Sequence, residues 1–172
     1  MRKKYLLGIT VVALLFSLML LGCPEPEPEP EEEFSEISKY KNGHSYKIID
    51  ITMSWTEAKK YCEDQGGYLV TITSAGEQEF IYKFLIAMGE KSVYWLGGYR
   101  DSDNNFKWVT GERFNYTNWA PGEPNGTFGR EDKIQLADFL NGCWNDGENA
   151  YNPGDDIKWS DLGFICEWDS HE

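Results

Sequence analysis

Residues 115–147 read NYTNWAPGEPNGTFGREDKIQLADFLNGCWNDG, and this stretch is the most informative part of the chain. Ca²⁺ takes 6 to 8 oxygen ligands at roughly 2.3–2.6 Å, and acidic and amide side chains on loops supply them. Five such oxygen donors could converge on one calcium ion: Glu123, Asn125, Glu131, Asn145 and Asp146. The simpler interpretation is a surface turn at 123–125 followed by a capped loop, since Pro, Asn and Asp commonly form both.

Shorter motifs on either side of this stretch follow one another in a specific order. They are Asn42-Gly43-His44-Ser45-Tyr46, Ser54-Trp55-Thr56-Glu57-Ala58 with Cys62, Gly66-Gly67-Tyr68-Leu69, Thr73-Ser74 with Glu77 and Phe80, Trp95-Leu96-Gly97, and Phe164-Ile165-Cys166-Glu167. In this order and spacing the chain resembles the C-type lectin domain over about residues 38–170. The resemblance implies an α+β, C-type lectin-like fold of two helices, small antiparallel sheets and a long structured loop region.

The resemblance also implies a ligand set for the metal. The family's principal calcium site, carried onto this sequence, uses Glu123, Asn125, Glu131, Asn145 and the side chain and carbonyl of Asp146. A cis peptide before Pro124 would turn Glu123 and Asn125 to the same side, and cis bonds are tolerated essentially only before proline. A second calcium site could draw on Asp101, Asp103, Glu131 and Asp132, although Gly126 stands where many members have an acid.

Sugar binding follows from an incompletely coordinated ion, because two neighbouring sugar hydroxyls can complete its shell. Each hydroxyl would donate to Glu123 or Glu131 and accept from the amide of Asn125 or Asn145. In the resembled family, Glu-Pro-Asn at this place goes with mannose, glucose, N-acetylglucosamine or fucose. We expect a single sugar to bind near millimolar, about −4 kcal/mol.

The secondary structure is legible at several places. Ser54 with Glu57, and Ser74 with Glu77, match the capping box at a helix N-terminus. Apolar residues recur after each at helical spacing. Short strands separated by turns are expected at Ser45–Asp50, Val93–Gly97, Lys107–Val109, Lys133–Leu136 and Gly163–Trp168.

The aromatic residues divide into two groups. Five tryptophans lie at motif positions that pack the core or support the loop in the resembled fold: Trp55, Trp95, Trp108, Trp119 and Trp144. Tyr151 and Trp159 lie in the segment 147–161, which is longer than is usual for the family. We expect these two to be candidates for contact with a ligand.

The chain has four cysteines. The resemblance pairs Cys62 with Cys166 as a long-range disulfide. It also places the family's inner disulfide at Lys133 and Asn149, so that bond is absent as a unit. Cys143 is then left over, with a buried apolar role favoured over an intermolecular bridge.

The N-terminus indicates export. Basic residues 2–4 and an apolar run to Leu21 are typical of a signal peptide. Leu20-Leu21-Gly22-Cys23 resembles the bacterial lipobox, which implies a signal peptide at 1–22 and lipidation, with palmitate as one acyl chain, of Cys23. An uncleaved membrane anchor is the alternative. The Pro/Glu-rich segment predicts an extended tether at 23–37, ahead of a lectin-like domain at 38–170.

Composition narrows the function. A net charge of −13 repels phosphate backbones, so we expect no nucleic-acid partner. With only His44 and His171 and no nucleophile arrangement, we expect no enzyme. The prediction is a calcium-dependent glycan receptor or adhesin, lipid-anchored at a membrane of a bacterial cell envelope, with the outer-membrane surface as one location. The alternative is a protein-binding adhesin on the same scaffold, with calcium only structural or absent.

Overall fold

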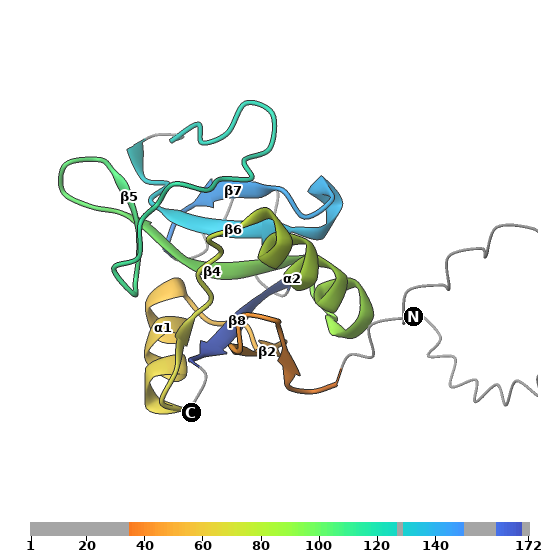
Figure 1. Ribbon diagram of the computed structural model, residues 1–172. Coiled ribbons are helices and arrows are strands. Elements are labelled where there is room, and N and C mark those ends of the chain that lie inside the picture. The colour runs from red at the N-terminus through yellow and green to blue at the C-terminus, as the bar shows by residue number, and fades with distance from the viewer. Residues whose placement is uncertain (1–34, 127–128, 150–160, 170–172) are drawn as a thin grey trace, which may run out of the picture. The chain divides into compact units, whose positions relative to one another are not determined.

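The computed structural model describes residues 35–126, 129–149 and 161–169 (Figure 1). Its elements, in chain order, are β1 (Ser38–Lys39), β2 (Ser45–Ile49), α1 (Trp55–Asp64), β3 (Tyr68–Leu69), α2 (Ala75–Met88), β4 (Val93–Arg100), β5 (Phe106–Trp108), β6 (Lys133–Ala137), the 3-10 helix η2 (Asp138–Leu140), β7 (Trp144–Gly147) and β8 (Leu162–Trp168). The α+β prediction is confirmed. No helix in these three ranges is long and apolar enough to cross a membrane.

The strands form one sheet rather than several small ones. Its described strands run in the order β1-β2-β8-β4-β6-β7, with β3 also paired to β8 and β5 to β4. The pairs of described strands are antiparallel, as expected, except that β4 and β8 are parallel, with Trp95 opposite Phe164. The C-terminal strand inserts between β2 and β4, and so joins the early and late parts of the chain.

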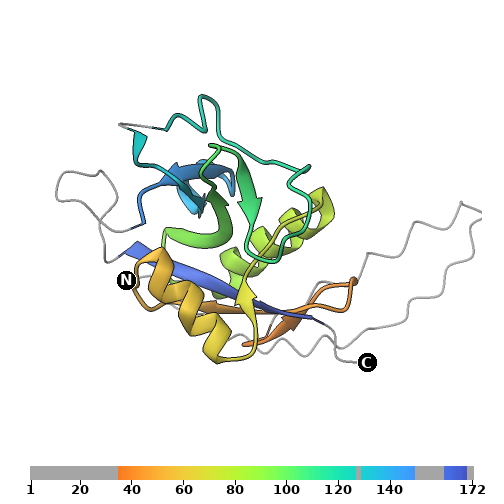
Figure 2. The same cartoon turned by 90° about the vertical axis from the view of Figure 1, so that its left-hand side faces the viewer.

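The two helices cover opposite faces of the sheet (Figure 2). Along β4 the side chains alternate: Tyr94 and Leu96 pack with Phe84 of α2, while Val93 and Trp95 pack with the cluster that contains Trp55 of α1. Period-two alternation in a strand produces this division. The result is two buried cores, one on each side of the sheet.

Both predicted helix starts are confirmed, but only one is a full capping box. Ser54 accepts from the Glu57 amide while the Glu57 carboxylate accepts from the Ser54 amide, so α1 is capped reciprocally. In α2 Ser74 accepts from the Glu77 amide, yet the Glu77 carboxylate accepts from Thr73 N at 2.8 Å instead. Glu77 is buried, and its carboxylate also accepts from the Tyr46 hydroxyl, so tertiary contacts decide its direction.

The cysteines behave as predicted in one case and not in the other. Cys62 of α1 and Cys166 of β8 form a disulfide. Cys143 carries a free thiol but is half-buried rather than buried, because it lies in the turn between η2 and β7 and not on a core-facing strand position. The predicted signal peptide, Cys23, Tyr151 and Trp159 lie outside the described residues.

Candidate functional site

Pairing of β6 with β7 brings Glu131 and Asp132, which precede β6, close to Asn145 and Asp146 of β7. Gln135 lies opposite Asn145 and Ile134 opposite Asp146. One step further on, the Asp132 amide donates to the Gly147 carbonyl at 3.1 Å. Glu131, next along the chain, is therefore at the same end of the sheet as Asp146. The sheet, rather than the local sequence, creates this proximity.

The Glu123–Asn125 turn lies against the same place. The peptide bond before Pro124 is cis, as predicted. The Asn125 side-chain amide donates to Glu123 Oε1 at 2.9 Å, and the Asn125 backbone amide donates to Glu123 Oε2 at 3.0 Å. The two side chains are thus on the same side of the turn.

Asp146 joins this turn to the sheet. Its side chain is 0% exposed, and Oδ1 accepts from the Asn125 backbone amide at 3.0 Å. Oδ2 accepts from the Gly126 amide and from Arg100 Nη2, each at 3.0 Å. A buried carboxylate requires such compensation, since an unpaired one is costly.

Two carboxyl groups meet at the Asn125 backbone amide, which donates to Glu123 Oε2 and to Asp146 Oδ1. Burial raises the pKa of Glu123 above its usual value, and the adjacent Asp146 carboxyl raises it further, against the hydrogen bonds from Asn125. Like charges held close together in this way are stabilised by a cation between them. The donor set of carboxylate and amide oxygens fits calcium, which prefers oxygen ligands.

Asn145 lies next to the Asp146 main chain. Its Nδ2 donates to the Asp146 carbonyl at 2.7 Å and to Gln135 Oε1 at 3.4 Å. A half-turn of the amide would exchange Nδ2 with Oδ1 beside that carbonyl, which is the orientation a cation requires. Of the predicted residues, Glu123, Asn125 and Asp146 are in direct contact, Asn145 adjoins them, and Glu131 is placed near them by the main chain.

An aromatic cluster around Trp144 packs next to the residues of the candidate calcium site. Trp144 makes edge contacts with Trp108, Tyr116 and Trp119, at ring-centroid distances of 5.6, 5.8 and 5.6 Å. Its indole N–H donates to Gln78 Oε1 at 2.8 Å. The prediction that tryptophans pack the core or support the loop is confirmed. Trp55, Trp95, Trp108 and Trp144 are buried, and Trp119 packs against the cluster that contains Trp108 and Trp144.

Two residues important to the site are not evident from the sequence. Arg100 is separated from Asp146 by 46 residues, and no motif marks it as part of the acidic loop. Asn149 accepts at its carbonyl from the Trp55 amide and at Oδ1 from the Thr56 amide, each at 3.0 Å, which ties the loop after β7 to the start of α1. The only sequence feature that pointed to Asn149 was its position, where the resembled family has a cysteine of the inner disulfide.

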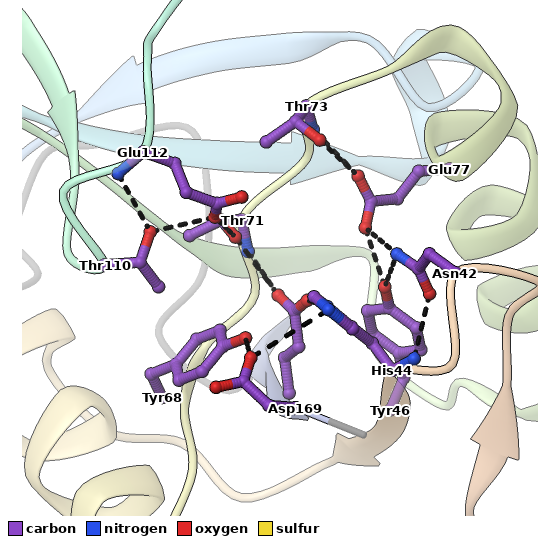
Figure 3. A network of polar contacts seen from close by, with 11 residues as sticks. Asn42, His44, Tyr46, Tyr68, Thr71, Thr73, Glu77, Thr110, Glu112 and Asp169 are labelled. Carbon is purple, nitrogen blue, oxygen red and sulfur yellow. Dashed lines mark hydrogen bonds and ion pairs between the residues drawn. The ribbon is translucent and has the colours of Figure 1, made fainter. Parts of the chain in front are cut away.

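A second polar cluster lies away from the acidic loop, where β2, α2 and β8 meet (Figure 3). One ligand atom each from His44, Glu77 and Glu167 lie within 4.8 Å of one another. The oxygens are already hydrogen-bonded: Glu77 accepts from Tyr46 and Thr73, and Glu167 accepts from Thr71 N at 2.8 Å. Among the described residues this cluster acts as a hydrogen-bonded junction between three elements.

In that junction the pKa values of Glu167 and His44 are both raised. Burial raises the pKa of Glu167 to about 7, although the hydrogen bonds from Thr71 and His44 lower it. Burial lowers the pKa of His44, but the Glu167 hydrogen bond at 2.6 Å and the surrounding carboxylates outweigh burial, so the pKa of His44 is raised. The pair holds its protons more tightly in the fold than in the unfolded chain.

Comparison with known proteins identifies a family and its relatives. Residues 51–167 match the family model described as the lectin C-type domain. The chain is 32% identical over 129 residues to C-type lectin domain family 4 member G of Mus musculus, covering 73% of this chain and 39% of that protein. This chain therefore spans about two fifths of that relative.

Two solved structures are similar to this chain in fold. SPL-1 in complex with GlcNAc is 25% identical, has a TM-score of 0.67 and covers 80% of this chain and 95% of its own. The C-type carbohydrate-recognition domain of cow CD23, determined in the presence of a GlcNAc2Man3 oligosaccharide, has a TM-score of 0.66 at 24% identity, covering 81% and 98%. At 24% identity the second likeness concerns the fold alone.

Proposed function

The chain belongs to the C-type lectin domain family, and from this premise we propose that it is a calcium-dependent lectin for mannose-type sugars. Family membership agrees with the expectation that the chain is not an enzyme. One observation carries the calcium proposal: the Asn125 backbone amide donates both to Glu123 Oε2 and to Asp146 Oδ1, each at 3.0 Å, so oxygens of two carboxylates meet at one N–H. A cation between them removes the repulsion and uses their oxygens.

The same geometry supports sugar binding. The Asn125 side-chain amide donates to Glu123 Oε1 at 2.9 Å, so a hydrogen-bond donor and an acceptor stand next to each other at the surface. A sugar hydroxyl is itself both donor and acceptor, and can insert between the two groups. Calcium would supply the attraction for hydroxyl oxygens, while Glu123, Asn125, Glu131 and Asn145 orient the ring. Glu-Pro-Asn favours the mannose class over galactose.

Attachment to a membrane is part of the proposal. Lipid on Cys23 would anchor the chain in a bacterial envelope, and the tether at 23–37 would hold the domain away from the surface. Many anchored copies raise avidity without a new contact. Radiolabelled palmitate incorporated into the wild type and not into Cys23→Ser would support the anchor, whereas equal incorporation would refute it.

Calorimetry tests the lectin proposal. We expect calcium to bind the purified chain, and methyl mannoside to give heat only when calcium is present. Methyl galactoside should give less heat under the same conditions. Asn145→Ala should lose both calcium and sugar binding, because an oxygen ligand and a hydroxyl partner are removed. Asn115→Ala, which changes an exposed amide elsewhere in the same loop region, is the matched control.

The outcomes separate the two candidate functions. Loss of sugar heat on addition of EDTA would support the lectin. Calcium binding with no heat from any of the mannose-class sugars would overturn it and favour a protein-binding adhesin with a metal-stiffened loop. Absence of calcium binding would overturn the metal-dependent mechanism itself.

A further inference from the structure

A cationic side chain, that of Arg100, lies beside the acidic loop, by which we mean residues 123–126 together with Asn145 and Asp146. Arg100 ends β4, and its Nη2 donates to Asp146 Oδ2 at 3.0 Å. Its Nη1 donates to Asn104 Oδ1 at 3.2 Å, and its Cζ lies 4.2 Å from the centroid of the Phe106 ring. The side chain is only 17% exposed. Stacking and two hydrogen bonds therefore hold the guanidinium in one place.

The hydrogen bonds of Asp146 leave room for one metal contact on one side. A carboxylate offers about four acceptor positions, two on each oxygen. Within the described residues, Oδ2 accepts from Arg100 and Gly126, so both of its positions are used. In the same part of the chain, the one hydrogen bond that Oδ1 accepts comes from the Asn125 backbone amide. The remaining position is on Oδ1, the oxygen bonded to the turn that carries Glu123.

Two of the four acids that could hold a second ion, Asp101 and Asp132, are committed to other partners. Asp101 pairs with Lys107 at 2.6 Å and accepts from the amides of Asp103 and Asn105. Asp132 pairs with Lys133 at 2.6 Å. A Cβ on Gly126 would lie 3.8 Å from Arg100 Nη2, so the guanidinium also occupies the space beside the position that lacks an acid.

We propose that Arg100 is a positioning residue that takes the place of a second metal ion in this loop. Its guanidinium neutralises Asp146, and Asp146 in turn holds the amides of Asn125 and Gly126, so the loop has its binding shape before calcium arrives. The loop then takes one calcium ion. The statement about calcium rests on the proposed function, whereas the ordering of the metal-free loop does not.

Hydrogen exchange of the metal-free protein tests this role directly. In EDTA we expect the Asn125 and Gly126 amides of the full chain to be protected. Arg100→Gln should exchange them faster by on the order of tenfold, because a charge-assisted bond to a buried carboxylate is lost. Arg113→Gln removes an exposed positive charge of the same kind and should leave the rates unchanged. Added calcium should restore protection in Arg100→Gln, so its calcium-induced rise in Tm should exceed that of the wild type.

Arg100→Lys separates charge from geometry, and keeps the proposal testable where Arg100→Gln does not fold. It retains the charge but loses the planar fork, so its exchange should be faster than that of the wild type. Wild-type rates in both variants would overturn the proposal, as would calorimetry showing two calcium ions in the loop. Absence of any calcium binding would defeat the proposed function alone, since the exchange rates in EDTA still decide what Arg100 does.

Discussion

At the scale of single residues, Asn149 is hydrogen-bonded to the start of α1. It stands at one of the two positions where the resembled family has an inner disulfide. Its main-chain carbonyl and Oδ1 accept from the first two amides of α1, and Oδ1 also accepts from Thr56 Oγ1 at 2.7 Å. Because the first amides of a helix have no partner within the helix, these bonds stabilise α1 and hold the loop after β7.

The contribution of this side chain can be measured. We predict that Asn149→Ala lowers the free energy of unfolding by about 1 kcal/mol, as loss of a helix-capping acceptor does. Urea denaturation measures the change. Asn115→Ala, at an exposed position without such a bond among the described residues, should change it little. Equal effects of the two substitutions would show that the Asn149 side chain is not a cap.

The His44–Glu167 pair predicts a dependence of stability on pH. Glu167 titrates near 4.5 in the unfolded chain and about 7 in the fold, so the folded state binds more protons in this range and stability falls as pH rises through it. His44 has a raised pKa, so its stabilisation is fully present below 6.5 and is lost as pH rises through the higher folded value. Both effects have the same sign.

We therefore expect the Tm to fall as pH rises from about 4.5 to about 7 through Glu167, and to fall further above pH 6.5 through His44. Glu167→Gln should flatten this slope, because the group that gains a proton on folding is removed. Glu63→Gln on the exposed face of α1 is the control and should keep it. A slope unchanged by Glu167→Gln would locate the proton uptake elsewhere.

At the scale of elements, the burial of a helix face decides what a helix contributes. In α2 the residues Phe80, Ile81, Phe84 and Leu85 enter the core beside Tyr46 and Tyr94. Ile86 and Met88 of the same helix are exposed. The helix is therefore held by tertiary packing on one side, which contributes more than intrinsic helix propensity.

Substitution on the two faces should differ in effect. Phe84 is 1% exposed, and Phe84→Ala should destabilise the fold by about 3–5 kcal/mol through lost contacts and the cavity left behind. Ile86 is 58% exposed, and Ile86→Ala should change stability by less than about 0.5 kcal/mol. Guanidinium denaturation of both variants measures the contrast, and similar losses would contradict the assignment of the buried face.

At the scale of the whole domain, the first and last parts of the sheet are joined twice. β2 pairs with β8 along its full length, with Ser45 opposite Trp168 and Ile49 opposite Phe164. The disulfide between Cys62 and Cys166 adds a covalent link across 104 residues. Contacts this distant in sequence are costly to form, and a cross-link reduces that cost by restricting the unfolded chain.

Removing the link should be the most damaging of the cysteine changes. In the chain-entropy account, the double substitution Cys62→Ala and Cys166→Ala loses on the order of 4 kcal/mol. Cys143→Ser, which changes a free thiol, should lose far less. Thermal unfolding of both variants decides, and equal stability of the double variant and the wild type would show that the non-covalent sheet suffices.

The sequence by itself determined the local features and the family. It indicated the helix starts at Ser54 and Ser74 and several short strands. Through the resemblance, it also indicated the Cys62–Cys166 pair and the Glu123–Asn125 turn. Helix caps and turns are readable without coordinates because they depend on short spacings, whereas the disulfide was readable only through the order of motifs along the chain.

Tertiary structure alone decided the contacts between distant segments. It turned Glu77 away from its own helix cap, brought Arg100 to Asp146, placed Asn149 at the start of α1, and made one mixed sheet by inserting β8 beside β4. Each depends on burial: a polar group removed from water must find a partner wherever the fold places one. For Glu77 the distant partner is Tyr46, 31 residues away, and for Asp146 it is Arg100, 46 residues away; no spacing rule reaches that far.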